Sequence, residues 1–267
     1  MERIVMVDQD GVVCNKDYQI TKDIKERVGE ITENDGIIIV PNSNTPAKRL
    51  INNFEVMLGI TPDSVIAEDG AVVVVRDHKI YSSKTNTVQF ARDLRDLFLF
   101  NGAVVEIGDS ATWIREGKKF APNSKLLIID GLREQTVGFY LKETDKNGMP
   151  YTSDEWSQEG LVIISQLTWP NQLNQLEYNS KYGIAISTVR GATKTSGYLA
   201  LREKCPADEF YMIGDTDYDI IQDNRVILCA VANATPLLKE KASFMANSIL
   251  TEGLEECLDW IIKKNGG

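Results

Sequence analysis

Two aspartates near the start of the chain are the first residues that could do chemistry. Asp8 and Asp10 stand in Asp8-Gln9-Asp10-Gly11-Val12, directly after the apolar run Arg3–Val7. If the alternation of a strand continues, both carboxylates lie on one side of it. Close like charges raise the pKa of one acid unless a cation neutralises them, and Mg²⁺ with oxygen ligands is a natural cation for this. Alone, the segment is also typical of an ordinary surface loop.

Two further segments offer groups that favour phosphate. Pro41-Asn42-Ser43-Asn44-Thr45-Pro46 supplies a hydroxyl and backbone N–H groups at a predicted helix start, a place that attracts anions. An ordinary helix cap has the same appearance. Lys194 follows Gly191-Ala192-Thr193 and opens another predicted helix, where the helix dipole slightly disfavours a cation. That placement hints at a role other than surface solvation.

A fourth segment carries three alternating acids. The apolar run Phe210–Ile213 is followed by Asp215, Asp217 and Asp219. Three alternating acids at the end of a predicted strand favour a metal site. A calcium loop of the EF-hand type is excluded, because it needs Gly at position six and Glu at position twelve. The chain has isoleucine and valine there.

Histidine and cysteine chemistry is nearly absent from this chain. His78 is the single histidine and stands in a predicted hairpin turn, so an HExxH zinc site is excluded, and no GxSxG segment accompanies it. The four cysteines show no CxxC spacing and are predicted to be buried thiols in a reducing compartment: Cys14, Cys205, Cys229 and Cys257. Any catalysis must therefore use carboxylates, lysine, hydroxyls or a bound metal.

Composition narrows the possible partners and location. The chain has 267 residues, of which 43% are hydrophobic, and its 39 acids against 29 bases give a net charge of -10. That charge argues against nucleic acid and anionic membranes as partners, since basic surfaces attract both. No apolar run approaches the roughly 18 residues of a membrane span, and no leader precedes the first run. We therefore expect a cytoplasmic protein.

The elements that must position these residues follow one pattern at both ends of the chain. Short apolar runs alternate with amphipathic segments, which predicts a parallel sheet covered by helices. The predicted strands are Arg3–Val7, Ile37–Val40, Val65–Ala67, Ala71–Val75, Phe210–Ile213 and Val226–Val231. Predicted helices run from a Thr21 cap to Gly36, from Thr45-Pro46 onward, over Thr193–Lys204, and after a Thr251 cap.

The middle of the chain has a different pattern. Strand-like runs at Gly102–Ile107, Leu126–Ile129 and Leu161–Ile164 are mixed with a helical segment at Phe90–Phe100. This predicts a second α/β unit at residues 83–186, inserted into a first unit formed by residues 1–82 and 187–267.

The order of the four segments resembles the haloacid dehalogenase (HAD) superfamily of phosphatases. DxDG comes first, then a strand-terminal Ser, a long insert, Lys, and GDxxxD about twenty residues later. The resemblance is to the Cof-type and sucrose-phosphatase-like branch, whose cap is inserted between the second and third motifs. It covers about 160 residues at the two ends, and LGITPDSVIAEDGA looks most like phosphoglycolate and sugar-phosphate phosphatases. It implies an α/β fold with a Rossmann-like three-layer parallel-sheet core and an inserted α/β cap that closes over the site and selects the substrate.

The resemblance also implies a reaction. The chain would be a Mg²⁺-dependent phosphomonoester hydrolase acting on a small phosphorylated metabolite such as a sugar phosphate or phosphoglycolate. Asp8 would be the nucleophile that forms an aspartyl-phosphate, and Asp10 the general acid and then the general base. The remaining implied roles are Mg²⁺ binding by Asp8, Asp10 and Asp215, phosphate binding by Ser43, Asn44 and Lys194, and orientation of a metal-bound water by Asp219.

Several positions depart from the family pattern. Tyr218 stands where Asn is common, Asn44 and Thr45 stand where Gly and Arg are common, and Asp69 replaces Asn. Three alternatives to the hydrolase stay open, and these departures bear on the catalytically silent relative among them. The first is a phosphomutase on the same scaffold. The others are a catalytically silent metal-binding relative and a phospho-acceptor signalling domain.

Overall fold

The apolar run near the start of the chain forms a central strand of a parallel sheet. This strand, β1 (Arg3–Val7), lies between β2 (Ile37–Pro41) and β12 (Glu209–Gly214). The sheet continues through β13 (Val226–Ala230) to β14 (Phe244–Met245), in the order β14-β13-β12-β1-β2. Every residue of β1 is buried, as a run that is apolar on both faces predicts.

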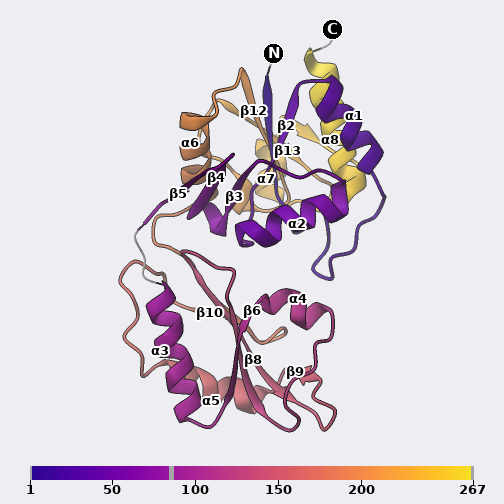
Figure 1. The fold of residues 1–267 in the computed structure, drawn as a ribbon. Coiled ribbons are helices and arrows are strands. Elements are labelled where there is room, and N and C mark those ends of the chain that lie inside the picture. Colours follow the sequence, from indigo (N-terminus) through magenta and orange to yellow (C-terminus); the bar gives the residue numbers. More distant parts are fainter. Residues whose placement is uncertain (1, 84–86, 266–267) are drawn as a thin grey trace. The chain divides into compact units, whose positions relative to one another are not determined.

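Helices cover both faces of this sheet. Val5 and Val7 pack in one apolar cluster with the first two helices and the last one, whereas Ile4 and Met6 pack in a second cluster with the other two. Figure 1 shows α6 and α8 on opposite sides of the strands. The helices of the first cluster are α1 (Lys25–Asn34), α2 (Ala47–Leu58) and α8 (Leu250–Asn265), and those of the second are α6 (Lys194–Lys204) and α7 (Pro236–Lys241). The core therefore has the three layers of a Rossmann-like fold.

A small antiparallel sheet follows α2. It consists of β3 (Ser64–Ala67), β4 (Val72–Val75) and β5 (His78–Tyr81), with the short 3-10 helix η1 (Glu68–Gly70) between its first two strands. The hairpin predicted around His78 is present. The histidine itself begins β5, where it pairs with Val75.

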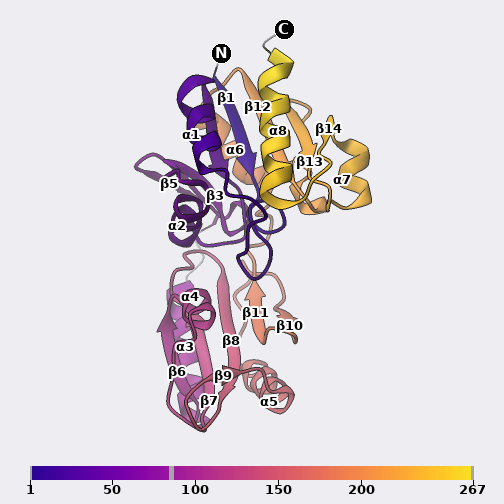
Figure 2. The ribbon, with the colours of Figure 1, turned by 90° about the vertical axis from the view of Figure 1, so that its right-hand side faces the viewer.

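The computed structural model describes residues 2–83 and 87–265, and the chain divides into two compact units. One is formed by Met1–Ser82 with Gly191–Gly267, and the other by Ser83–Arg190, so the second unit ends four residues later than the predicted insert. Its sheet has the order β10-β11-β8-β7-β6 with β9 paired to β8, and Figure 2 shows β8, β11 and β10 next to one another. Its elements are α3 (Thr87–Phe100), β6 (Val104–Gly108), α4 (Ser110–Arg115), β7 (Lys125–Asp130), β8 (Val137–Thr144), β9 (Pro150–Tyr151), α5 (Asp154–Ile164), β10 (Glu177–Asn179) and β11 (Ile184–Ser187).

Some sequence-based assignments are wrong in detail. The predicted strand Leu161–Ile164 is the last turn of α5, which the Ser153 side chain caps by accepting from the Trp156 N–H. Short apolar runs do not distinguish a strand from a buried helix turn. Thr21 caps no helix, because α1 begins at Lys25. Its hydroxyl instead lies 3.1 Å from that of Thr251, which is inside α8 rather than capping it.

The cysteines are free, and Cys14, Cys229 and Cys257 are buried as predicted, while Cys205 is half-buried. In the part of the chain that the structure describes, no helix is long and apolar enough to cross a membrane.

Candidate active site

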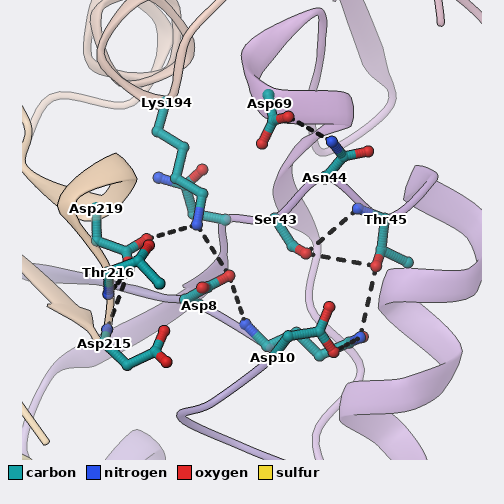
Figure 3. A network of polar contacts seen from close by, with 12 residues as sticks. Asp8, Asp10, Ser43, Asn44, Thr45, Asp69, Lys194, Asp215, Thr216 and Asp219 are labelled. Carbon is teal, nitrogen blue, oxygen red and sulfur yellow. Dashed lines mark hydrogen bonds and ion pairs between the residues drawn. The ribbon is translucent and has the colours of Figure 1, made fainter. Parts of the chain in front are cut away.

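Asp8 lies at the carboxyl end of β1, where the sheet places it beside β12. Its backbone N–H donates to Ile213 O at 3.1 Å, which continues the ladder between the two strands. Asp8 is buried, and its Oδ1 accepts from the Gln9 N–H at 2.8 Å. The same oxygen lies 2.9 Å from Lys194 Nζ (Figure 3). Carboxyl ends of parallel strands are where open α/β sheets bind ligands.

Lys194 is the first residue of α6 and is also buried. The Thr193 side chain caps the helix by accepting from the Ser196 N–H at 3.1 Å. Lys194 Nζ forms a second ion pair with Asp219 Oδ1 at 2.5 Å. Burial alone would lower the pKa of Lys194, but the two carboxylates raise it above its ordinary value, so the side chain stays charged.

Two glycines allow the start of α6 to come this close to η1. A Cβ on Gly70 would lie 2.1 Å from Thr193 O, and a Cβ on Gly197 would lie 2.9 Å from Gly70 Cα. Gly70 also has a positive φ of 85°. This close backbone contact fixes the position from which Lys194 reaches Asp8.

Asp219 belongs to the 3-10 helix η2 (Asp217–Asp219), which directly follows β12. It is fully buried. Its Oδ2 accepts from the backbone N–H groups of Asp215 at 3.0 Å and of Thr216 at 2.9 Å. With Oδ1 held by Lys194, both oxygens bind protein donors. Asp219 therefore locks the loop that carries Asp215 and holds Lys194 at the same time.

The carboxylates fit a small cation with oxygen ligands. One oxygen each of Asp8, Asp215 and Asp219 lies within 4.8 Å of the others. Asp215 Oδ1 is buried and has no hydrogen-bond partner among the described residues. Such an atom is costly unless it binds something else. Burial, with the charge of Asp219, raises the pKa of Asp215 to about 6. Lys194 supplies one positive charge against these carboxylates, which leaves an excess of negative charge that Mg²⁺ would neutralise.

Gly11 makes room for the Asp215 carboxylate. A Cβ at Gly11 would lie 2.0 Å from Asp215 Oδ2, and Gly11 has a φ of 90°. Asn233 Nδ2 donates to Gly11 O at 2.9 Å, which holds the turn in place. The glycine in the Asp-x-Asp-Gly segment thus has a steric reason at this site.

The second segment follows β2 and lies across from Asp8 (Figure 3). Ser43 is buried, and its N–H donates to Ile66 O at 3.0 Å, while its Oγ accepts from the Thr45 N–H at 3.2 Å. The Asn44 side chain donates to Asp69 Oδ2 at 2.5 Å. The predicted cap at Thr45 is one residue early, because Pro46 is the N-cap of α2 and the helix begins at Ala47.

Two other positions singled out from the sequence are exposed, in contrast to the buried residues above. Asp10 is exposed, and its Oδ1 accepts from Gln9 Nε2 at 3.2 Å. Tyr218, which replaces the common Asn, is 83% exposed. Sequence reasoning missed Gln9, which is fully buried between the two aspartates. A polar residue between two acids at the end of a buried strand was the signal that could have found it.

The family model of haloacid dehalogenase-like hydrolases matches residues 5–258. The chain belongs to this family. The match spans both compact units of this HAD-like hydrolase and includes every predicted site residue.

Solved structures share its fold at low sequence identity. A protein of Thermotoga maritima matches with a TM-score of 0.65 and 13% identity, over 100% of this chain and 98% of its own. A haloacid dehalogenase-like hydrolase of Bacteroides thetaiotaomicron matches with a TM-score of 0.64 and 15% identity, over 98% and 100%. A second protein of that organism, described among phosphatases of the superfamily, matches with a TM-score of 0.56 and 18% identity, over 97% and 95%. No curated protein sequence matches the HAD-like hydrolase significantly.

Proposed function

We propose that this HAD-like hydrolase is a Mg²⁺-dependent phosphomonoester hydrolase that acts on a small phosphorylated metabolite, such as a sugar phosphate or phosphoglycolate. One observation carries the proposal: the buried Asp8 carboxylate lies 2.9 Å from Lys194 Nζ, beside the unpaired Asp215 oxygen. The description of a structural neighbour as a phosphatase supports the reaction class.

The first chemical step is attack on phosphorus. An oxygen of Asp8 forms a bond to phosphorus while the bond from phosphorus to the alcohol oxygen breaks. Asp10, in its protonated form, gives its proton to the departing oxygen, so a neutral alcohol leaves and an aspartyl-phosphate remains on Asp8. A carboxylate nucleophile divides one difficult displacement into two easier ones.

The second step is hydrolysis of the aspartyl-phosphate. A water molecule gives a proton to the Asp10 carboxylate as its oxygen bonds to phosphorus, and the bond between phosphorus and Asp8 breaks. Inorganic phosphate leaves, Asp8 is a carboxylate again and Asp10 is protonated for the next substrate. One residue thus serves as acid and then as base, each role contributing typically about 100- to 10,000-fold in rate.

The remaining groups in the proposal offset the repulsion between the anionic phosphate and the Asp8 carboxylate. Lys194, the Ser43 hydroxyl and the Asn44 backbone N–H hold the phosphoryl oxygens. Mg²⁺ would be held by the Asp8 and Asp215 carboxylates and the Asp10 backbone carbonyl, and when bound it supplies positive charge that offsets the approach of two anions. We assign to Asp219 the task of holding Lys194 and the Asp215 loop, because its oxygens already bind protein donors.

The proposal extends to substrate choice and location. It assigns substrate selection to the second unit, Ser83–Arg190, whose inserted position matches the cap implied by the sequence. The net charge of -10 opposes a nucleic-acid partner, and the four free cysteines support a reducing, cytoplasmic location.

Phosphate release tests the proposal. The assay measures inorganic phosphate from p-nitrophenyl phosphate and from a panel of phosphorylated metabolites, ranked by kcat/KM. We expect activity with Mg²⁺, none with EDTA, and none in Asp8→Asn. Full activity in Asp8→Asn would remove Asp8 from its role. Phosphate transfer to a sugar hydroxyl in place of water would identify a mutase.

A further inference from the structure

We propose that Gln9 is a positioning residue that holds the Asp10 carboxyl group and ties it to the turn containing Ser43. The inference rests on the proposed function, in which Asp10 donates and accepts the proton. It concerns a residue that lies between the two aspartates in sequence. Its amide side chain can act neither as the nucleophile nor as the general acid and base.

Burial of the Gln9 side chain is the first observation. Gln9 has no exposed surface, although it carries a primary amide with two N–H donors and a carbonyl acceptor. A buried amide is costly unless its groups are hydrogen-bonded. Here Nε2 donates to Asp10 Oδ1 at 3.2 Å and to Thr45 Oγ1 at 3.4 Å, and Oε1 accepts from Asn53 Nδ2 at 2.7 Å.

Asn53 anchors this amide to a rigid element. It lies in α2 and is 2% exposed. Because the Asn53 amide donates to Gln9 Oε1, the nitrogen end of Gln9 faces Asp10 and can only donate. The hydrogen bonds therefore run in one direction, from Asn53 through Gln9 to Asp10.

This direction distinguishes the two oxygens of the Asp10 carboxyl group. Gln9 donates to Oδ1, which favours Oδ2 as the oxygen that carries the proton in the acid form. No second hydrogen bond to the Asp10 carboxylate is found among the described residues. Gln9 thus keeps one oxygen occupied and leaves the proton-bearing oxygen for the substrate.

The second N–H of Gln9 reaches the proposed phosphate-binding turn. Thr45 Oγ1, which accepts it, lies 3.4 Å from Ser43 Oγ, and the Thr45 N–H donates to that same Ser43 oxygen at 3.2 Å. Asp10, Ser43 and Thr45 are labelled in Figure 3. One buried amide therefore fixes the distance between the proton donor and the turn that would hold the phosphoryl group.

The leaving group of the substrate separates positioning from a purely structural role. An alkoxide is strongly basic and needs the proton of Asp10 as it departs, whereas p-nitrophenolate is weakly basic and departs without it. Loss of positioning should therefore slow alkyl phosphates far more than p-nitrophenyl phosphate. Loss of fold or of active enzyme lowers both rates equally.

The experiment compares kcat/KM for the best alkyl phosphate of the panel and for p-nitrophenyl phosphate, since this constant reports the steps up to the aspartyl-phosphate. The variants are Gln9→Leu and the double variant Gln9→Leu/Asn53→Leu, which leaves no buried amide without a partner. Thr251→Val is the matched control, because Thr251 is a buried polar residue of the first unit whose partners Thr21 and Lys22 lie outside the site.

We expect both Gln9 variants to lose about 10- to 100-fold in kcat/KM on the alkyl phosphate and less than about threefold on p-nitrophenyl phosphate. The control should keep the wild-type ratio. Equal losses on both substrates, or no loss on either, would overturn the role of Gln9 while leaving the proposed function intact. A wild-type enzyme inactive on both substrates with Mg²⁺ would overturn the proposed function itself.

Discussion

Replacing Lys194 with methionine should destabilise the first unit strongly. Lys194 Nζ lies 2.5 Å from Asp219 Oδ1 and 2.9 Å from Asp8 Oδ1, and all three side chains are less than 10% exposed. Methionine keeps most of the side-chain volume and removes the charge, so two carboxylates remain buried without their common partner. Breaking a buried ion pair from one side costs about 3–5 kcal/mol in the free energy of unfolding. The total free energy of unfolding of a protein domain is only about 5–15 kcal/mol, so this loss is a large part of it.

The same helix offers the control. Lys204 ends α6, is 55% exposed and pairs with Glu203 at 3.6 Å, so Lys204→Met should cost about 0–1 kcal/mol. A second variant, Lys194→Met/Asp219→Asn, removes one of the stranded charges and should regain part of the loss.

The assay is urea unfolding in EDTA, followed by far-UV circular dichroism and by tryptophan fluorescence. Trp260 is the one tryptophan of the four that lies in the first unit, so fluorescence separates the two units when the other three are replaced by phenylalanine in the background chain. If Lys194→Met is as stable as the wild type, or if Lys204→Met is equally damaging, the buried ion-pair network does not have the energetic role that its geometry indicates.

Three further predictions concern other parts of the molecule. Gly11→Ala places a Cβ 2.0 Å from Asp215 Oδ2, so Mg²⁺ affinity by titration calorimetry should fall about 10- to 100-fold, and unchanged affinity would contradict the proposed metal position. Burial lowers the pKa of Lys142 to about 8, below its value in the unfolded chain. Unfolding therefore takes up a proton between about pH 8 and 10.5, and the free energy of unfolding should rise with pH across this window by more in the wild type than in Lys142→Met; parallel pH profiles would refute this. Trp156 is fully buried and its indole N–H donates to Leu126 O at 3.1 Å, so Trp156→Ala should cost the second unit about 3–5 kcal/mol by urea unfolding, and a loss below 1 kcal/mol would show that the ring is not a core anchor.

The core strands could be predicted from the sequence because they are almost entirely apolar. A run such as Arg3–Val7, apolar on both faces and followed by a polar loop, has few places in a soluble fold other than the middle of a covered parallel sheet. The Leu161–Ile164 run is equally apolar, but it packs as the end of α5 because Ser153 starts a helix upstream of it. Apolar character alone predicts burial, and the upstream cap decides the element.

The sequence identified candidate residues for the site but not the contacts between them. Spacing and resemblance brought forward Asp8, Lys194 and Asp215, and the fold brings their side chains together. No spacing rule shows that both oxygens of Asp219 bind protein donors, because these contacts depend on the local turn after β12. Gln9 was missed for a similar reason, since its partners Thr45 and Asn53 lie 36 and 44 residues away in the sequence.

Trapping of the covalent intermediate tests the central claim most directly. The wild-type enzyme is mixed with substrate and Mg²⁺, quenched in acid within one turnover, and treated with borohydride, which reduces an acyl phosphate to an alcohol. Peptide mass spectrometry then reads residue 8. We predict conversion of Asp8 to homoserine in the fraction of enzyme that carries the aspartyl-phosphate when the reaction is quenched. An unmodified Asp8 in an enzyme that releases phosphate at full rate, or the same modification at another aspartate, would contradict the account.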